Sequence, residues 1–254
     1  MLFAFLIGTA FAVQDVSLKT QDGLTLHARG QKVKGASKGV VMVHMLGRDA
    51  VDWDFTAGQL VDDGFTVVAP DLRGHGKSPQ SGQELAQTDY LNMLHDVNAA
   101  VDWLRSQGVT EVSCMGADLG ANLCLQAAAE EPAVVNLVLL SPSLNTKGIL
   151  SPPALKGYGN RPILLVASDE DQPAAHAASL LVSRAQGQAH LELLTDAGHG
   201  TTMLNRDGSL EGLVQRWLLG TYQFGTGEIV VPRPGMNVDT AQIETEGQKL
   251  QSHE

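Results

Sequence analysis

The sequence has few cysteines, no excess of basic residues and no nucleotide-binding or metal-binding pattern. Two cysteines in 254 residues are too few for a fold held together mainly by disulfides. Lysine and arginine total 17 against 28 acidic residues, so the net charge of -11 argues against nucleic acid or an anionic membrane surface as a partner. The chain has no G-x-G-x-x-G or phosphate loop, and its histidines and acids lack metal-ligand spacing. We therefore expect no cofactor and no metal.

The two ends of the chain differ in composition from the rest. Residues 1–12, MLFAFLIGTAFA, are apolar, too short to span a bilayer, and end in small residues as a secretory signal peptide does. We expect export to the periplasm or the medium after their removal, with no membrane span in the mature chain. Because no Lys or Arg precedes the apolar core, an upstream start codon or a membrane-resting stub are the alternatives. Residues 223–254 are polar and predict a disordered tail, which leaves one domain at residues 13–222.

Eight short apolar runs predict the strands of one sheet. From the third run onward they alternate with helical patterns, which is typical of parallel strands buried on both faces. The first two runs predict an antiparallel hairpin at one edge. The runs are residues 16–18, 24–28, 40–43, 66–69, 112–115, 134–140, 163–167 and 191–194.

Three helices and the environment of the cysteines also follow from the pattern. Apolar residues at spacings of three and four predict a helix over residues 89–106, with Thr88 as its N-cap. Pro173 predicts the start of a helix that continues over residues 174–184, and a last helix is expected over residues 208–219. Cys114 on a strand and Cys124 on the following helix suit apolar positions, so we expect two buried free thiols.

The segment Gly116-Ala117-Asp118-Leu119-Gly120 lies between a strand and a helix-forming stretch. It has the form of a G-x-S-x-G nucleophile elbow, in which the middle residue occupies a strained turn and small neighbours let strand and helix approach closely. Here the middle residue is Asp118. An aspartate at this position can attack carbon through its carboxylate, whereas a serine would form an acyl-enzyme.

Polar segments follow four other strands of the predicted sheet. The third strand runs into His44-Met45-Leu46-Gly47-Arg48 and the fourth into residues 71–78, DLRGHGKS. The seventh strand ends in Ser168-Asp169-Glu170-Asp171, and the eighth in Asp196-Ala197-Gly198-His199-Gly200. With the elbow, these five motifs resemble the α/β-hydrolase superfamily, over nearly all of residues 13–222. Within the superfamily, the motifs most resemble those of small bacterial serine hydrolases of the lysophospholipase-like or dienelactone-hydrolase-like kind.

The resemblance implies a fold and a set of roles. The fold is an eight-stranded, mostly parallel sheet with helices on both faces and a minimal cap. Asp171 would orient His199, and His199 would act as the base, in the family's chain order of nucleophile, acid and histidine. The backbone amides of Met45 and Leu119 would form the oxyanion hole.

The same resemblance indicates what surrounds the site. Arg48 would reach its rim, and His44 would frame it with a structural role in its loop. The segment between the sixth and seventh predicted strands, residues 141–161, is too short for a helical cap domain and predicts an open cleft for a small or medium substrate. Tyr158 in this segment would line the mouth, or alternatively pack the loop against the body.

Asp118 sets the choice between functions. Two carboxylates beside one imidazole favour its protonated form, which cannot act as a base. If Asp118 attacks an sp3 carbon, however, the resulting ester is neutral, and the histidine can activate water, as in haloalkane dehalogenases and epoxide hydrolases of the superfamily. The chain has Leu119 where dehalogenases place Trp, and Tyr158 is the one tyrosine in the cap segment. We rank a hydrolase with an Asp-His-Asp constellation first, a catalytically inactive ligand-binding or interaction domain second, and a purely structural exported domain third.

Overall fold

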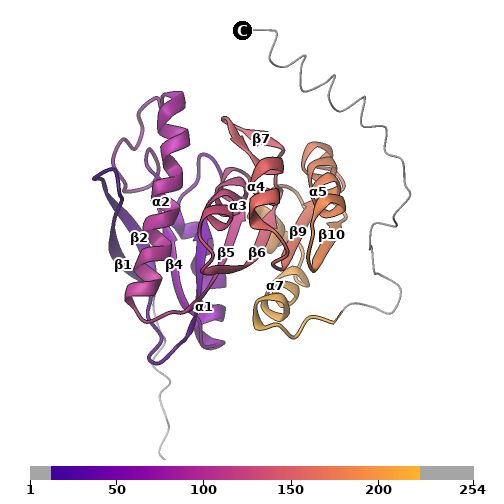
Figure 1. Cartoon of the computed structure of the whole chain (residues 1–254), viewed down its shortest axis with the longest axis horizontal. Coiled ribbons are helices and arrows are strands. Elements are labelled where there is room, and N and C mark those ends of the chain that lie inside the picture. The colour runs from indigo at the N-terminus through magenta and orange to yellow at the C-terminus, as the bar shows by residue number, and fades with distance from the viewer. Residues whose placement is uncertain (1–12, 224–254) are drawn as a thin grey trace, which may run out of the picture. The chain divides into compact units, whose positions relative to one another are not determined.

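The computed structural model describes residues 13–223, which form one α/β unit (Figure 1). The predicted signal peptide lies outside the described residues, as does the predicted tail from residue 224 onward. Eight strands form the main sheet in the order β1-β2-β4-β3-β5-β6-β9-β10. They are β1 Gln14–Lys19, β2 Thr25–Gln31, β3 Lys38–Val43, β4 Thr66–Pro70, β5 Glu111–Ala117, β6 Val134–Leu140, β9 Ile163–Ser168 and β10 Ala189–Leu194.

All eight predicted strands are confirmed, and so is the edge hairpin. β1 pairs antiparallel with β2, and β2 pairs antiparallel with β4. The pairs from β4 to β10 are parallel, so their carboxyl ends share one edge of the sheet. Chain order reverses around β3, which lies between β4 and β5. In open α/β sheets, ligands bind outside the carboxyl ends of the strands at such a switch point.

The sheet is buried on both faces, as its continuous apolar runs predict. In β3, Val41 and Val43 belong to the core cluster that also contains residues of α2, α3, α4 and α5. Val40 and Met42 are equally buried at 0% exposure and, because side chains alternate along a strand, face the opposite side. Figure 1 shows α2, α3, α4 and α5 in front of the sheet.

The helices include the three that the sequence predicts. They are η1 Ala50–Trp53, α1 Asp54–Asp62, α2 Gln87–Ser106, α3 Leu119–Glu130, α4 Ser151–Tyr158, α5 Gln172–Arg184, α6 Thr202–Arg206 and α7 Leu210–Leu219. The predicted cap of α2 is wrong, because the helix begins at Gln87 and Thr88 lies inside its first turn. The carboxylate of Asp89 instead accepts the backbone amide of Ala86, at 2.9 Å. This bond satisfies the amide of the residue before the helix, and the N-cap residue Ala86 makes no side-chain bond to the amides of the first turn.

A short ribbon and α4 make up the segment between β6 and β9. The strands β7 Asn145–Thr146 and β8 Ile149–Leu150 pair antiparallel, and α4 follows at once. The side chain of Asn122 in α3 is fully buried and holds the ribbon, since it donates to the carbonyl of Ile149 and accepts the amide of Ser143. The segment therefore forms no separate cap domain, in agreement with its length.

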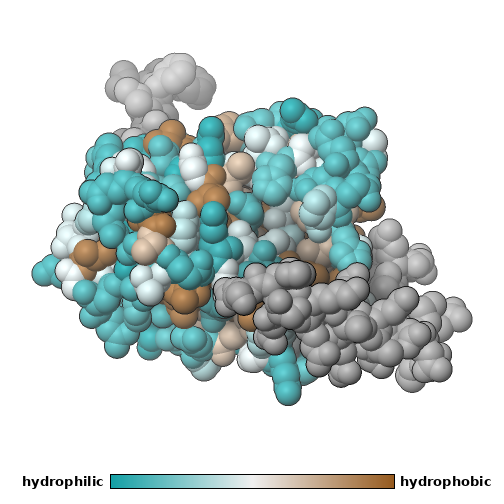
Figure 2. All heavy atoms as spheres, turned by 90° about the horizontal axis from the view of Figure 1, so that it is seen from above, coloured by the Kyte–Doolittle hydropathy of each residue, from teal (hydrophilic) through white to brown (hydrophobic). Residues whose placement is uncertain are grey.

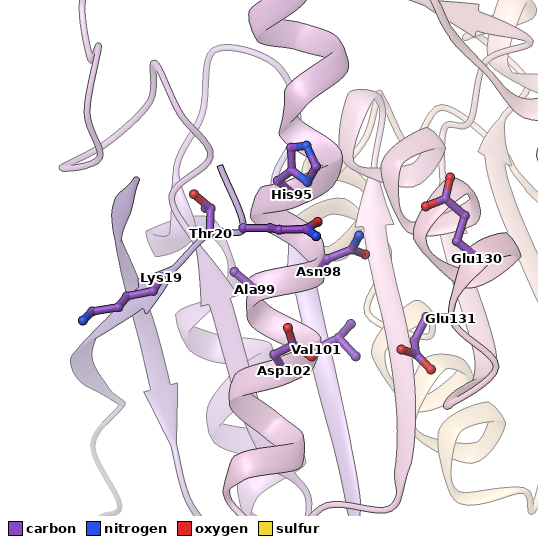
Figure 3. Close-up of a pocket in the computed structure, with 10 residues that line it drawn as sticks. Lys19, Thr20, His95, Asn98, Ala99, Val101, Asp102, Glu130 and Glu131 are labelled. Atoms are coloured by element: carbon purple, nitrogen blue, oxygen red, sulfur yellow. The ribbon is translucent and has the colours of Figure 1, made fainter. Parts of the chain in front are cut away.

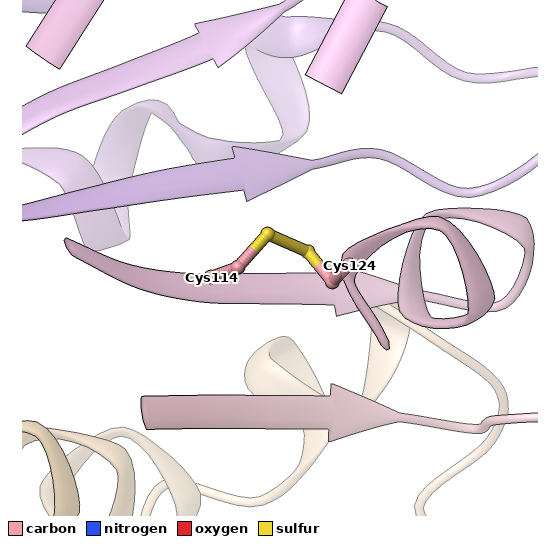
Figure 4. Close-up of a disulfide and its surroundings, with 2 residues drawn as sticks. All are labelled: Cys114 and Cys124. Atoms are coloured by element: carbon pink, nitrogen blue, oxygen red, sulfur yellow. A yellow bond between two sulfur atoms is a disulfide. The ribbon is translucent and has the colours of Figure 1, made fainter. Parts of the chain in front are cut away.

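The two cysteines form a disulfide, which corrects the prediction of free thiols. Cys114 in β5 and Cys124 in α3 have Cα atoms 5.6 Å apart and are bonded through sulfur (Figure 4). Both are fully buried. The disulfide joins the strand that enters the elbow to the helix that leaves it, and so closes the turn at Asp118 covalently.

The face of the described residues that Figure 2 shows is mainly hydrophilic. Seen from above, hydrophobic residues form separate areas divided by hydrophilic ones (Figure 2). Among residues 13–223, no helix combines the length and the apolar character that crossing a membrane requires.

Candidate functional site

Asp118 occupies the turn between β5 and α3 in a strained backbone conformation. Its φ of 50° and ψ of -114° lie outside the regions that non-glycine residues usually adopt. The flanking glycines explain how the turn fits. A Cβ on Gly116 would lie 2.2 Å from the carbonyl oxygen of Gly120, and a Cβ on Gly120 would lie 2.3 Å from that of Val43. Both positions therefore require glycine, as the elbow motif predicts.

The carboxylate of Asp118 has one oxygen bound and the other directed to a histidine. Oδ2 accepts the backbone amide of Leu46, at 3.3 Å. Oδ1 lies 3.9 Å from Nε2 of His199. The Asp118 side chain is 21% exposed, so it is partly open to solvent.

His199 lies on the loop after β10 and contacts both predicted acids. Its Nδ1 lies 2.6 Å from Oδ2 of Asp171, which is the N-cap residue of α5. A hydrogen bond to Nδ1 leaves Nε2 to face Asp118. Its side chain is 43% exposed and that of Asp171 is 15% exposed. The structure thus brings Asp118, His199 and Asp171 together at the carboxyl edge of the sheet.

The loop after β3 is held from below by His44. This residue is fully buried, and burial lowers the pKa of its imidazole to about 4. The neutral ring makes one bond of each kind: Nδ1 lies 2.8 Å from the Met45 carbonyl, and Nε2 accepts the amide of Leu72 at 3.0 Å. His44 therefore joins the loops after β3 and β4 and has the structural role that the sequence analysis favoured.

The amide that contacts Asp118 belongs to Leu46 and not to Met45, the residue predicted for the oxyanion hole. Gly47 follows Leu46 with a φ of 75°, and this turn directs the Leu46 amide toward the elbow. The Met45 side chain points toward the histidine loop, since its sulfur lies 3.4 Å from Oγ1 of Thr201. Leu119 is the first residue of α3, where backbone amides have no partner within the helix, so its predicted place beside the site is kept.

The two other predicted pocket residues differ in outcome. Arg48 is 56% exposed, and its guanidinium forms an ion pair with Asp52, whose carboxylate also accepts the hydroxyl of Thr201 at 2.9 Å. It therefore lies close to the histidine loop, on the rim. Tyr158 is not a pocket residue. It is 2% exposed, and its hydroxyl donates to the carbonyl of Pro162. Pro162 directly precedes β9, so this bond lies at the amino end of that strand, opposite the carboxyl ends that carry the site. The alternative of loop packing holds.

A separate hollow of about 480 Å³ lies beside α2 and away from these residues. Figure 3 shows His95, Asn98 and Asp102 on the helix between Lys19 on one side and Glu130 and Glu131 on the other. Its lining includes none of Asp118, Asp171 and His199. The hollow is therefore separate from the candidate site at the carboxyl ends of the strands.

Comparisons with known proteins agree with this fold. A family model described as "Serine aminopeptidase, S33" matches residues 35–160. Esterase Pf2001 of Pyrococcus furiosus superimposes with a TM-score of 0.67 at 19% identity, over 83% of this chain and 90% of the esterase. The chain has the α/β-hydrolase fold and resembles that superfamily in sequence over residues 35–160. A dienelactone hydrolase from Anabaena variabilis gives a TM-score of 0.69 at 21% identity, over 84% of this α/β-hydrolase chain and 100% of the other.

Relatives found by sequence are longer than this chain. An uncharacterized protein of Mycobacterium tuberculosis is 28% identical over 184 residues, which are 70% of this chain and 52% of the relative. A serine hydrolase-like protein of Dictyostelium discoideum is 31% identical over 140 residues, 54% of this chain and 36% of its own length. The α/β-hydrolase chain thus spans about half the length, or less, of these curated relatives.

Proposed function

We propose that this α/β-hydrolase chain hydrolyses a small or medium substrate through a covalent intermediate on Asp118. The observation that carries the proposal is that the two oxygens of the Asp118 carboxylate have different contacts. Oδ2 occupies the backbone-amide site at Leu46, and Oδ1 lies on the side of His199. His199 is in turn held by Asp171. The proposed nucleophile therefore lies beside the proposed base, and the base lies beside the acid that orients it.

The first step forms an alkyl-enzyme ester. Oδ1 of Asp118 attacks an sp3 carbon of the substrate, the new carbon–oxygen bond forms, and the leaving group departs with the electrons of the broken bond. The amide of Leu46 remains on Oδ2 during this step. Esterification removes one of the two negative charges beside His199.

The second step releases the product and restores the enzyme. His199 Nε2 accepts a proton from water while the water oxygen attacks the carboxyl carbon of Asp118. Charge then develops on Oδ2, where the Leu46 amide and the predicted Leu119 amide stabilise it. Collapse breaks the bond between the carboxyl carbon of Asp118 and the alkyl oxygen, and the product alcohol takes the proton from His199. Asp118 retains one oxygen atom from water, and its new carboxyl group releases the remaining proton to solvent, which restores the carboxylate.

The heavy-oxygen experiment tests this assignment. A single turnover in heavy-oxygen water, with enzyme in excess over an alkyl halide or epoxide, should leave label in the peptide that contains Asp118. Asp52, a carboxylate with a 9% exposed side chain in another peptide, should gain none. Asp118→Asn should abolish labelling. Label found only in the product would contradict attack by Asp118.

A binding function is the second candidate, because one observation favours it. Tyr158 was the sole cap tyrosine that could assist a leaving group, and it is buried at the other edge of the sheet. Leu119 offers no polar side chain either. Turnover would therefore depend on substrates whose leaving group departs as a stable anion. Absence of any single-turnover label across halides, epoxides and esters, with a folded protein that still binds ligand, would establish this second candidate.

We also propose that the protein is exported, as its apolar first 12 residues predict. The Cys114–Cys124 disulfide supports this, because disulfides persist in oxidising compartments and are rare in the cytosol of mesophiles. Fractionation of expressing cells, with alkylation of free thiols before lysis, tests both points. Cytosolic protein with two alkylated cysteines would contradict the proposal.

A further inference from the structure

Ser141 is the first residue after β6 and has an unusual backbone conformation. Its φ of 46° lies in the left-handed region, which glycine adopts freely and other residues adopt at a cost. It is also 1% exposed, so its polar groups have no access to water. Such a residue persists where the surrounding structure holds it in place, and these positions cluster at functional sites.

The contacts of Ser141 and of the residue before it reach the three segments that carry the candidate site. Its amide donates to the carbonyl of Val166 in β9, the strand that leads to Asp171. The residue before it, Leu140, accepts the amide of Asp118 at 2.9 Å. Its hydroxyl oxygen accepts the amide of Gly200, the residue directly after His199, at 2.9 Å.

Gly200 is closely confined, so its position determines that of the histidine. Its φ is 57°, and a Cβ at this position would lie 2.7 Å from the sulfur of Met45. Met45 packs on one side, and the Ser141 hydroxyl binds the amide. Since His199 is the adjacent residue, a shift of Gly200 would move the imidazole relative to Asp118, 3.9 Å away.

We propose that Ser141 is a positioning residue for His199, and that its hydroxyl, not its backbone conformation, is what the site requires. The left-handed turn places the side chain beneath the histidine loop. A glycine would adopt the same turn without cost, but it would leave the buried Gly200 amide without an acceptor. The inference rests on the proposed role of His199 as the base, but its test does not require turnover.

The test compares Ser141→Ala with Ser141→Gly by NMR of protein labelled with ¹⁵N in histidine. Both variants remove the hydroxyl, and only the glycine variant relieves the left-handed conformation. The readout is the exchange with water of the Nδ1 proton between His199 and Asp171, assigned with His199→Gln. We expect exchange to be roughly fivefold faster, or more, in both variants, since a lost hydrogen bond has about this effect on an equilibrium. Ser151→Ala is the matched control, because Ser151 is also fully buried and donates to the carbonyl of Ser143.

Each outcome decides the proposal. Unchanged exchange in folded Ser141→Gly would overturn it, whether or not Ser141→Ala folds. Faster exchange in Ser141→Ala alone would assign the effect to the backbone and also overturn it. An equal effect of Ser151→Ala would show a general loosening and not positioning. Because the readout is the histidine itself, a failure to find turnover would count against the proposed function and not against this role of Ser141.

Discussion

Two histidines of this molecule lie between two aspartates, and their surroundings give them opposite roles. His199 has Asp171 at 2.6 Å and Asp118 at 3.9 Å. His27 has Asp71 at 2.7 Å and Asp15 at 3.2 Å. The His27 side chain is 16% exposed, against 43% for His199.

The difference lies in how the carboxylates are used. Asp71 is 2% exposed, and backbone amides occupy both of its oxygens: Ala50 donates to Oδ1 and Lys77 to Oδ2, each at 2.8 Å. Asp71 therefore joins β2 to two loops and has no oxygen left for chemistry. Asp118 has one oxygen on an amide and the other facing an exposed imidazole. A histidine between two aspartates thus has a structural role at Asp71, where it links β2 to two loops, and forms a candidate reaction centre at Asp118.

The largest effect should come from changing the nucleophile. We expect Asp118→Ser to raise hydrolysis of short activated esters on the order of 10³-fold, because in the proposed roles Asp171, His199 and the Leu46 amide would supply the rest of a serine-hydrolase site. Rates with p-nitrophenyl acetate and butyrate measure this. Fluorophosphonate should label Asp118→Ser and not the wild type.

Two outcomes of this experiment would separate the explanations. Adding His199→Ala should abolish the gain, since the serine then has no base. A folded Asp118→Ser protein that hydrolyses these esters no faster than wild type would show that the site differs from a serine hydrolase beyond one residue. Fluorophosphonate labelling of the wild type would mean that another residue is the nucleophile.

A matched pair of substitutions tests the comparison through stability. Asp71→Asn replaces one oxygen with an amide nitrogen, which faces a buried donor, so we expect a loss of ~3 kcal/mol in the free energy of unfolding. Asp118→Asn keeps an acceptor for Leu46, and asparagine tolerates a positive φ, so its cost should stay below ~1 kcal/mol. Urea unfolding of both variants provides the measurement. Equal losses of stability in the two variants would contradict the distinction between a structural role for Asp71 and a reactive one for Asp118.

The disulfide gives the elbow a covalent clasp, with a somewhat smaller expected effect. Cys114 and Cys124 are 10 residues apart in sequence, and closing a loop of this size stabilises a fold by roughly 2–3 kcal/mol in the chain-entropy model. Cys114→Ala with Cys124→Ala should lose about this amount in urea unfolding. Reductant should lower the stability of the wild type and leave the double variant unchanged. Equal stability of reduced and oxidised wild type would contradict this.

The sequence predicted the parts that depend on local pattern. Apolar runs located the eight strands, and the glycines of the elbow located Asp118, because no other residue fits at Gly116 or Gly120. It also predicted that His199 and Asp171 lie beside Asp118, since parallel strands end at one edge. Their chemical roles remain proposals.

The predictions that failed depend on how segments turn and pack in three dimensions. Burial of Tyr158 depends on Pro162 and on Arg161, whose guanidinium lies 4.3 Å from its ring. The disulfide depends on how α3 packs on β5, and the choice of Leu46 over Met45 depends on the turn at Gly47. Residue type and spacing do not encode these placements. Ser141 carried no signal in the sequence, because only the structure shows its left-handed conformation.

The smallest predicted effect concerns pH and a third histidine, the fully buried His44. Its pKa is lowered to about 4 in the folded chain, from an unfolded value near 6.5, because burial disfavours the charged ring. A lowered folded pKa means that the unfolded chain binds the proton first as pH falls. The stability that the neutral His44 contributes is therefore fully present above pH 6.5, falls as the pH is lowered, and is lost below pH 4.

At pH 5 the loss from His44 should be about 2 kcal/mol. His44→Gln keeps an acceptor and a donor in its side chain but cannot titrate. The wild type should therefore lose stability between pH 7 and pH 5 more steeply than this variant, by about that amount in urea unfolding. Parallel pH curves would mean that the loop after β3 tolerates a charged ring at His44. The neutral state of His44 would then have no part in holding the Leu46 amide toward Asp118.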